Sequence, residues 1–75
     1  MITKIKNKKE LIKFINSNIG DDRLHLSVVF KYNTESNDGY LKEVFTKESL
    51  IKLWDYEDKV RGIYFLEIEN LEKNN

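Results

Sequence analysis

Few side chains in this sequence are of the types that carry out chemistry. The chain has no cysteine and a single histidine, His25. A zinc site requires about four ligands, and a Ser–His–Asp triad would have to depend on His25 alone. His25 alternates with the apolar residues of an extended segment, so an exposed histidine on a sheet is the simpler interpretation. We therefore expect no metal site and no cofactor.

Carboxylates could still supply acid–base chemistry or hold a cation. Glu67 and Glu69 fall on one face of a predicted strand and could mimic an acid–base pair, but solvated strand surface also accounts for them. Asp21 and Asp22 follow Gly20 as turn-forming residues commonly do, and the ligand spacing of an EF-hand is absent. Three scattered glycines exclude a glycine-rich phosphate loop. The sequence therefore predicts a protein that is not an enzyme.

Acidic and aromatic residues gather towards the C-terminal end. Residues 55–72 carry six acidic and two basic side chains, a net charge of −4. Tyr56 lies among several of these carboxylates, and a tyrosine flanked by charge is typical of a hot spot for binding a protein of opposite charge. The other interpretation is that the acids only keep the surface soluble. The predicted partner-binding acidic-aromatic face consists of Asp55, Tyr56, Glu57, Asp58, Glu67 and Glu69.

Lysines gather at the opposite end of a chain whose overall charge is zero. Residues 1–13 carry five lysines and one glutamate, a net charge of +4. Lysines contact phosphates through charge and do not read bases, and the only aromatic residue among them, Phe14, is expected in the core. The alternatives are a solvated helix surface and a weak nucleic-acid-binding accessory protein. The residues that would bind nucleic acid are Lys4, Lys6, Lys8, Lys9 and Lys13.

The elements that position these residues begin with a helix from about Lys8 to Asn18. Asn7 is a good N-cap with Glu10 at the third helical position, and Gly20 lies where a C-terminal glycine is common. Residues 1–6 form either an arm or a short strand.

Strand patterns follow. Arg23–Tyr32 alternates apolar and polar residues without interruption, and a polar stretch ending in Asp38-Gly39 predicts the turn of a hairpin onto a second strand, Tyr40–Phe45. A second helix begins after the N-cap Thr46 and ends near Glu57. A last strand runs from Val60 to about Glu69, and residues 71–75 form a flexible tail.

Together these elements predict one small α+β domain over residues 1–75. It has two layers, the order (β)αββαβ, and a mainly antiparallel sheet with two helices on one face. With a strand at residues 2–6, this order would match the ferredoxin-like arrangement, which places the first strand in the middle of the sheet. That segment is the weakest strand candidate, so we expect three strands with Arg23–Tyr32 at the centre.

Two helices cover only one face of such a sheet. On the other face, the predicted alternation exposes an apolar patch of Val29, Ile63 and Phe65. Exposed apolar patches mark interfaces. A homodimer is the simplest explanation, and a different protein partner is the alternative.

The composition bears on the cellular compartment of the protein and on the kind of genome that encodes it. No apolar run approaches the ~20 residues of a membrane span, and no signal-peptide cleavage pattern follows the basic N-terminal segment, so we expect a cytoplasmic protein. The chain lacks Ala, Pro, Gln and Cys, a bias typical of A/T-rich genomes. Short domains of this kind are common among accessory proteins of phages and plasmids. The sequence thus predicts a non-enzymatic protein-binding module that inhibits or regulates a host nucleic-acid-processing enzyme.

Overall fold

The computed structural model describes residues 2–17, 23–34 and 38–71, which form two helices and four strands. In chain order these are β1 (Ile2–Ile5), α1 (Lys8–Ser17), β2 (Arg23–Tyr32), β3 (Asp38–Thr46), α2 (Lys47–Val60) and β4 (Ile63–Asn70).

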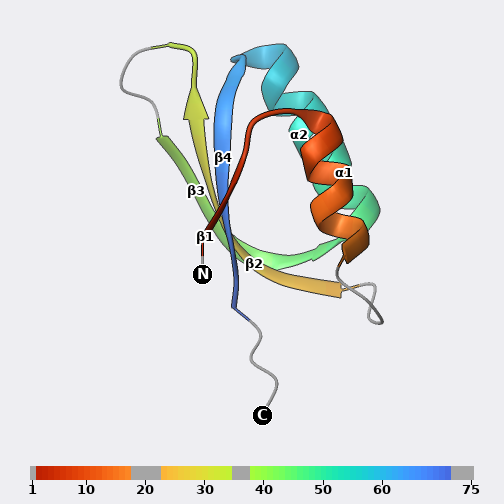
Figure 1. Cartoon of the computed structure of the whole chain (residues 1–75). Helices are drawn as coiled ribbons and strands as arrows, with labels where there is room; N and C mark the ends of the chain where they lie inside the picture. The colour runs from red at the N-terminus through yellow and green to blue at the C-terminus, as the bar shows by residue number, and fades with distance from the viewer. Residues whose placement is uncertain (1, 18–22, 35–37, 72–75) are drawn as a thin grey trace.

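The four strands form one antiparallel sheet in the order β1-β4-β2-β3 (Figure 1). The central position of β2 confirms the prediction, but the three-strand expectation is wrong because residues 2–5 add a fourth strand beside β4. The ferredoxin-like arrangement would place β1 in the middle of the sheet, whereas here it lies at an edge. Only Ile5 of its four residues is buried, and an edge strand needs fewer apolar residues than a central one.

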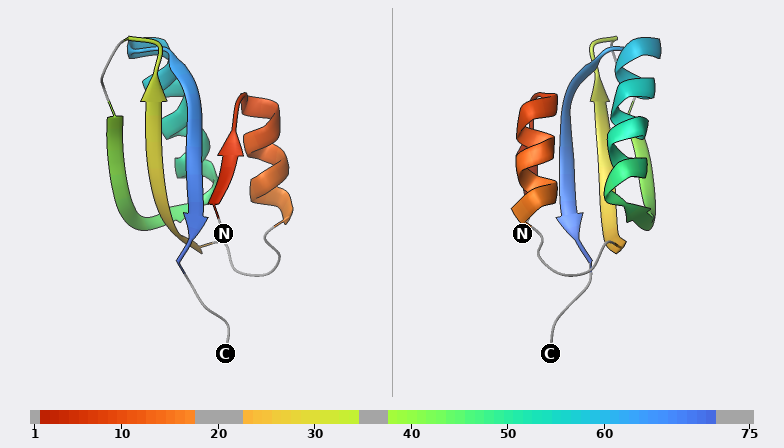
Figure 2. Two further views of the ribbon diagram at one scale, coloured as in Figure 1. Left: turned by 60° about the vertical axis from the view of Figure 1, so that its left-hand side comes forward. Right: turned by 90° about the vertical axis from the view of Figure 1, so that its right-hand side faces the viewer.

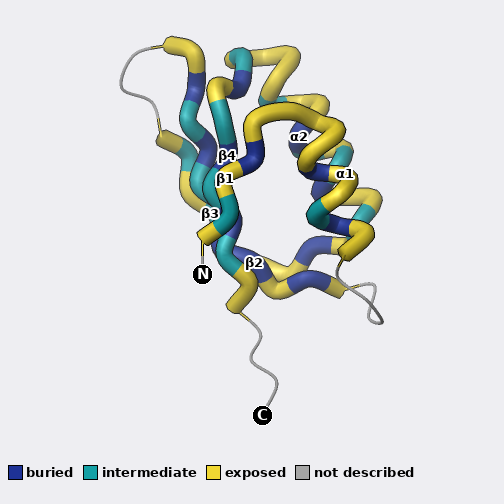
Figure 3. The backbone as a smooth tube through the Cα atoms, in the orientation of Figure 1, coloured by how far each residue is buried: buried dark blue, intermediate teal, exposed yellow. Residues whose placement is uncertain are grey.

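Both helices lie on the same face of the sheet, as predicted, with α1 near β1 and α2 over the other half (Figures 1 and 2). The core fills the space between the two layers (Figure 3). From β2 it takes alternate residues, and from the helices it takes the residues at helical spacing that face the sheet. Its members are Ile5, Leu11, Ile15, Leu24, Leu26, Val28, Phe30, Tyr32, Phe45, Leu50, Trp54, Ile63, Leu66 and Ile68.

The start of α1 follows the predicted cap. The Asn7 side chain accepts a hydrogen bond of 2.9 Å from the Glu10 N–H, and Glu10 Oε1 accepts one of 2.8 Å from the Lys6 N–H. These bonds satisfy backbone donors that the first helical turn leaves without partners. Gly20 and the Asp21-Asp22 pair lie outside the described residues.

The end of α2 differs from the prediction. Thr46 and Ser49 cap its start reciprocally, each side chain accepting from the other's backbone N–H. The helix continues beyond Glu57 to Val60, and Gly62 then adopts a φ of +76° and donates to the Asp58 carbonyl at 3.0 Å. Gly62 is therefore the glycine that terminates α2, not a residue of the last strand.

A β-bulge next to this glycine changes the predicted alternation of β4. Lys31 pairs with Phe65 and Tyr32 pairs with Ile63, so Tyr64 is an extra residue between them. Ile63 consequently faces the core and is only 8 % exposed, whereas Tyr64 is 65 % exposed. The expectation that Ile63 lies on the open side with Phe65 is wrong, because a pattern of period two does not anticipate the extra residue.

The predicted hairpin from β2 onto β3 is confirmed, but Asp38 and Gly39 belong to β3 and not to its turn. Gly39 lies opposite Phe30 in the register. A Cβ atom at Gly39 would come within 2.7 Å of the Tyr32 hydroxyl oxygen, which is closer than non-bonded atoms approach. The glycine therefore accommodates the Tyr32 side chain.

Candidate docking surface

The face of the sheet opposite the helices is the candidate functional site, and we call it the open face. Neither α1 nor α2 lies on it (Figure 2). The strand registers place alternate residues of all four strands there. They are Ile2 and Lys4 of β1, Phe65, Glu67 and Glu69 of β4, Arg23, His25, Ser27, Val29 and Lys31 of β2, and Asp38, Tyr40, Lys42, Val44 and Thr46 of β3.

Aromatic rings and an aliphatic residue occupy the open face. Tyr40 is 55 % exposed, and Val29 and Phe65 are half-buried. The exposed Tyr64 at the bulge packs against Phe65 with 5.2 Å between ring centroids. Lys4 Nζ lies 4.3 Å from the centroid of the Phe65 ring, a favourable cation–π distance. The surface thus offers both apolar area and charge.

A hollow of about 140 Å³ lies on the open face between Tyr40 and two carboxylates, Glu67 and Glu69. Val29, Ile2 and Ser27 complete its lining. Carboxylates bind guanidinium and ammonium groups through charge-assisted hydrogen bonds, and a tyrosine ring attracts a cation to its face. The hollow therefore suits the head group of one basic side chain.

Opposite charges alternate over the open face. Lys31 Nζ on β2 lies 2.9 Å from Asp38 Oδ2 on β3. The hydrogen bond from Lys31 to Asp38, together with the negative charges of Asp38 and Glu67, raises the pKa of the Lys31 ammonium group although partial desolvation opposes this. Four cationic side chains, those of Lys4, Arg23, Lys31 and Lys42, share the face with three carboxylates, those of Asp38, Glu67 and Glu69.

The structure does not bring the predicted acidic-aromatic face together. Glu67 and Glu69 lie on the open face, whereas the other members belong to α2 in the opposite layer. Of these, Tyr56 is 61 % exposed on α2. The proposed face of six residues is therefore divided between the two sides of the domain.

Each carboxylate of α2 in that set stabilises the fold. Asp55 Oδ1 pairs with Lys8 Nζ of α1 at 3.0 Å, and Asp58 Oδ1 accepts a hydrogen bond of 2.9 Å from the Ile63 N–H. Glu57 Oε1 accepts one of 2.8 Å from the Tyr32 hydroxyl. Burial, followed by the hydrogen bond to Glu57, raises the pKa of Tyr32. These bonds join α2 to three neighbouring elements.

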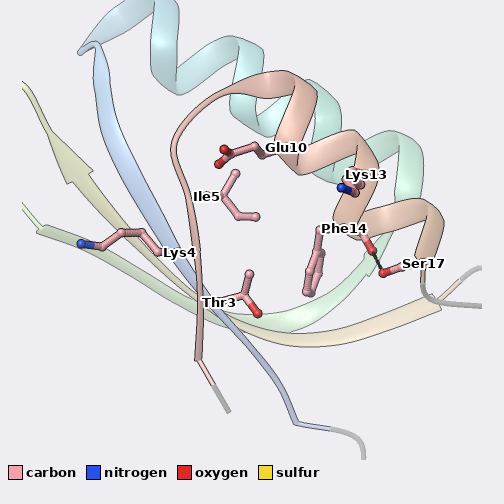
Figure 4. A pocket seen from close by; sticks show the side chains of 7 residues that line it. All are labelled: Thr3, Lys4, Ile5, Glu10, Lys13, Phe14 and Ser17. Atoms are coloured by element: carbon pink, nitrogen blue, oxygen red, sulfur yellow. Dashed lines mark hydrogen bonds between the residues drawn. The ribbon is translucent and has the colours of Figure 1, made fainter.

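The N-terminal lysines do not form one basic strip either. Lys4 lies on the open face, Lys8 is paired with Asp55, and Lys13 borders a groove between β1 and α1 (Figure 4). Lys6 and Lys9 are exposed between these positions. This arrangement divides the +4 charge of residues 1–13 over different sides of the domain.

His25 is exposed on the open face, and its carbonyl oxygen accepts a hydrogen bond of 2.8 Å from the Leu71 N–H. Within residues 2–17, 23–34 and 38–71, no three His, Asp or Glu side chains are grouped so that they could hold a metal ion. In the same part of the chain, neither helix combines the length and apolar character needed to cross a bilayer.

Two residues of the open face, Tyr40 and Tyr64, were not predicted from the sequence as site residues. Tyr40 could have been found from the hairpin register, which sets it opposite Val29. The alternation of the strand could not have identified Tyr64, because a pattern of period two does not contain the extra residue of the bulge.

Comparison with known proteins assigns no family: no family model matches the chain, and no curated protein or solved structure shows significant similarity to it.

Proposed function

We propose that this protein is a non-enzymatic binding module that docks on another protein through the open face. The observation that supports this most strongly is the combination of Tyr40, Tyr64 and Phe65 on a sheet face that neither helix covers. Tyrosine is enriched at the energetic centres of protein interfaces because it buries a large ring and retains a polar group. A partner that covers these rings would remove apolar area from water.

The partner side chain that fits the hollow of this face is basic. The hollow between Tyr40, Glu67 and Glu69 accepts one lysine or arginine head group, and the surrounding rings pack against its aliphatic stem. Nucleic-acid-processing enzymes present such residues in their substrate grooves. We therefore propose that the protein is an inhibitor or regulator of an enzyme of this class, is encoded by a phage or other mobile element, and acts in the cytoplasm.

A matched pair of tyrosines tests the proposal. Tyr64 on the open face and Tyr56 on α2 are 65 % and 61 % exposed, so alanine at either position removes a similar surface ring. Affinity capture from host lysate should lose its specific partner with Tyr64→Ala/Glu67→Lys and retain it with Tyr56→Ala. Equal recovery by the two variants would exclude the open face as the docking surface.

Nucleic-acid binding is the second candidate. It is favoured by one observation, the ammonium group of Lys4 over the ring of Phe65, which packs against Tyr64. Single-stranded nucleic acids bind to basic surfaces with aromatic stacking platforms. Glu67 and Glu69 oppose it by repelling phosphates. Fluorescence polarisation with labelled single- and double-stranded probes at about 50 mM salt tests it. Binding that Lys4→Glu abolishes would support nucleic-acid binding as the function, and the absence of binding to either probe would exclude it.

A further inference from the structure

A groove of about 380 Å³ separates β1 from α1 (Figure 4). Ile5 and Phe14 supply its apolar surface, Ile5 being 2 % exposed and Phe14 half-buried. Glu10, Lys13, Phe14 and Ser17 recur at the spacing that places them on one side of a helix. The groove shares Lys4 with the open face, and its other lining residues play no part in the docking proposed above.

The strand that borders the groove has an unused side. Among the residues that the structure describes, β1 is the terminal strand of the sheet and pairs with β4 alone. In an edge strand, the N–H and C=O groups of alternate residues point away from the sheet and can pair with an added strand. The polar side chains along the helix side are already engaged, since Glu10 accepts from the Lys6 N–H and Ser17 donates to the Phe14 carbonyl. The groups that can still pair with an added strand are therefore the backbone N–H and C=O groups of β1.

The charged side chains next to β1 determine which residues an added strand would need. Lys13 and Lys4 both line the groove, and the Lys4 side chain extends from β1 towards the open face (Figure 4). A strand added beside β1 would alternate its side chains between these two sides. Those that face α1 would meet Ile5 and Phe14, and those on the other side would lie next to Lys4 at cross-strand distance. Pairing between the β1 strands of two copies is disfavoured because it would bring two Lys4 side chains onto the same face of the joined sheet.

We propose that this groove binds an extended segment of another protein, in which apolar and acidic residues alternate, as a fifth strand beside β1. Backbone hydrogen bonds to β1 would supply affinity, and the two sets of side chains would supply selectivity, as in other cases of strand addition. The open face and the groove would then bind different parts of one partner or two separate partners.

An NMR titration tests this proposal. The probe is a short, end-blocked peptide of alternating valine and glutamate, added to ¹⁵N-labelled protein, and the matched probe has lysine in place of glutamate. The glutamate peptide should shift the amide signals of Ile2–Ile5 and slow their exchange with solvent. It should bind roughly threefold more tightly than the lysine peptide, as one opposite-charge cross-strand pair predicts.

Two further arms separate strand pairing from attraction by charge alone. Lys4→Glu should reverse the preference between the two peptides, whereas Lys52→Glu on the exposed surface of α2 should not. N-methylation of alternate peptide nitrogens should abolish binding, because it removes the donors that strand pairing requires. The proposal is overturned by unchanged binding of the methylated peptide, by shifts confined to other elements, or by no shifts with about 1 mM peptide. None of these results depends on Tyr64, so they are independent of the docking proposal.

Discussion

The Ser27 hydroxyl on β2 donates a 2.9 Å hydrogen bond to the Tyr40 hydroxyl on β3, and this bond holds the Tyr40 ring at the border of the acidic hollow. The two residues are diagonal neighbours across the strand pair, since Tyr40 lies opposite Val29. Ser27 is only 6 % exposed, so its hydroxyl depends on this partner. The bond links the stability of the sheet to the shape of its open face.

The first prediction follows from this bond. Ser27→Ala and Tyr40→Phe should each lower the free energy of unfolding by about 0.5–1.5 kcal/mol, the usual net contribution of one hydrogen bond. The double variant should cost less than the sum of the two, because either change alone already breaks the bond. Urea denaturation of the four proteins measures this coupling. Strict additivity would show that the bond does not contribute in solution.

The second prediction concerns Phe65, which is half-buried on the open face, and its neighbour Leu66, which is completely buried in the core. Phe65→Glu should give a folded monomer, because its charge remains accessible to water, whereas Leu66→Glu should unfold the domain. Circular dichroism and light scattering report folding and mass. Unfolding by Phe65→Glu would show that Phe65 belongs to the core. A dimeric wild type that Phe65→Glu dissociates would identify a second copy as the occupant of the open face.

The third prediction concerns alkaline stability. The pKa of Tyr32 is raised above its ordinary value of 10.0 by burial and by Glu57. The unfolded state therefore loses this proton first, and the stabilisation is complete below about pH 10 and declines as the pH rises through the raised value. The raised pKa of Lys31 acts in the same direction. Tyr32→Phe should lower the free energy of unfolding at neutral pH by about 1–3 kcal/mol and make its alkaline decline shallower. An unchanged decline would contradict the assignment.

The fourth prediction concerns Gly62, whose φ of +76° lies in the left-handed region. Gly62→Ala should cost about 1–2 kcal/mol in backbone strain, and its Cβ would also meet the Asn33 Nδ2 atom at 2.9 Å. Gly62→Asn should be tolerated better, because asparagine adopts this conformation more readily. Thermal unfolding of both variants measures the difference. Equal stability of Gly62→Ala and the wild type would show that the helix does not end through a left-handed residue.

Sequence reasoning succeeded where a periodic pattern was long and uninterrupted. The perfect alternation of Arg23–Tyr32 predicted the central strand, and the caps Asn7 and Thr46 predicted where both helices begin. It failed where one residue changed the periodicity. Treating Gly62 as part of a strand shortened α2. The unanticipated bulge reversed the expected direction of Ile63 and removed Tyr64 from consideration.

The candidate site was predicted in part for the same reason. Val29 and Phe65 were placed on the open face, and Glu67 and Glu69 were identified as binding residues. Their grouping with Tyr56 into one surface was wrong, because α2 and β4 present their charges on opposite sides of the domain. Proximity along the chain does not reveal this arrangement. Only the tertiary arrangement brings Tyr40 to Glu67 and Glu69.

Site-specific photo-crosslinking in the native host tests the central claim most directly. A photoreactive phenylalanine analogue replaces either Tyr64 or Tyr56, two tyrosines of similar exposure on opposite layers of the domain. We predict a discrete crosslink from position 64 to one other protein and none from position 56. A crosslink from position 56 alone, or no crosslink from position 64 while the protein is expressed and folded, would contradict docking through the open face.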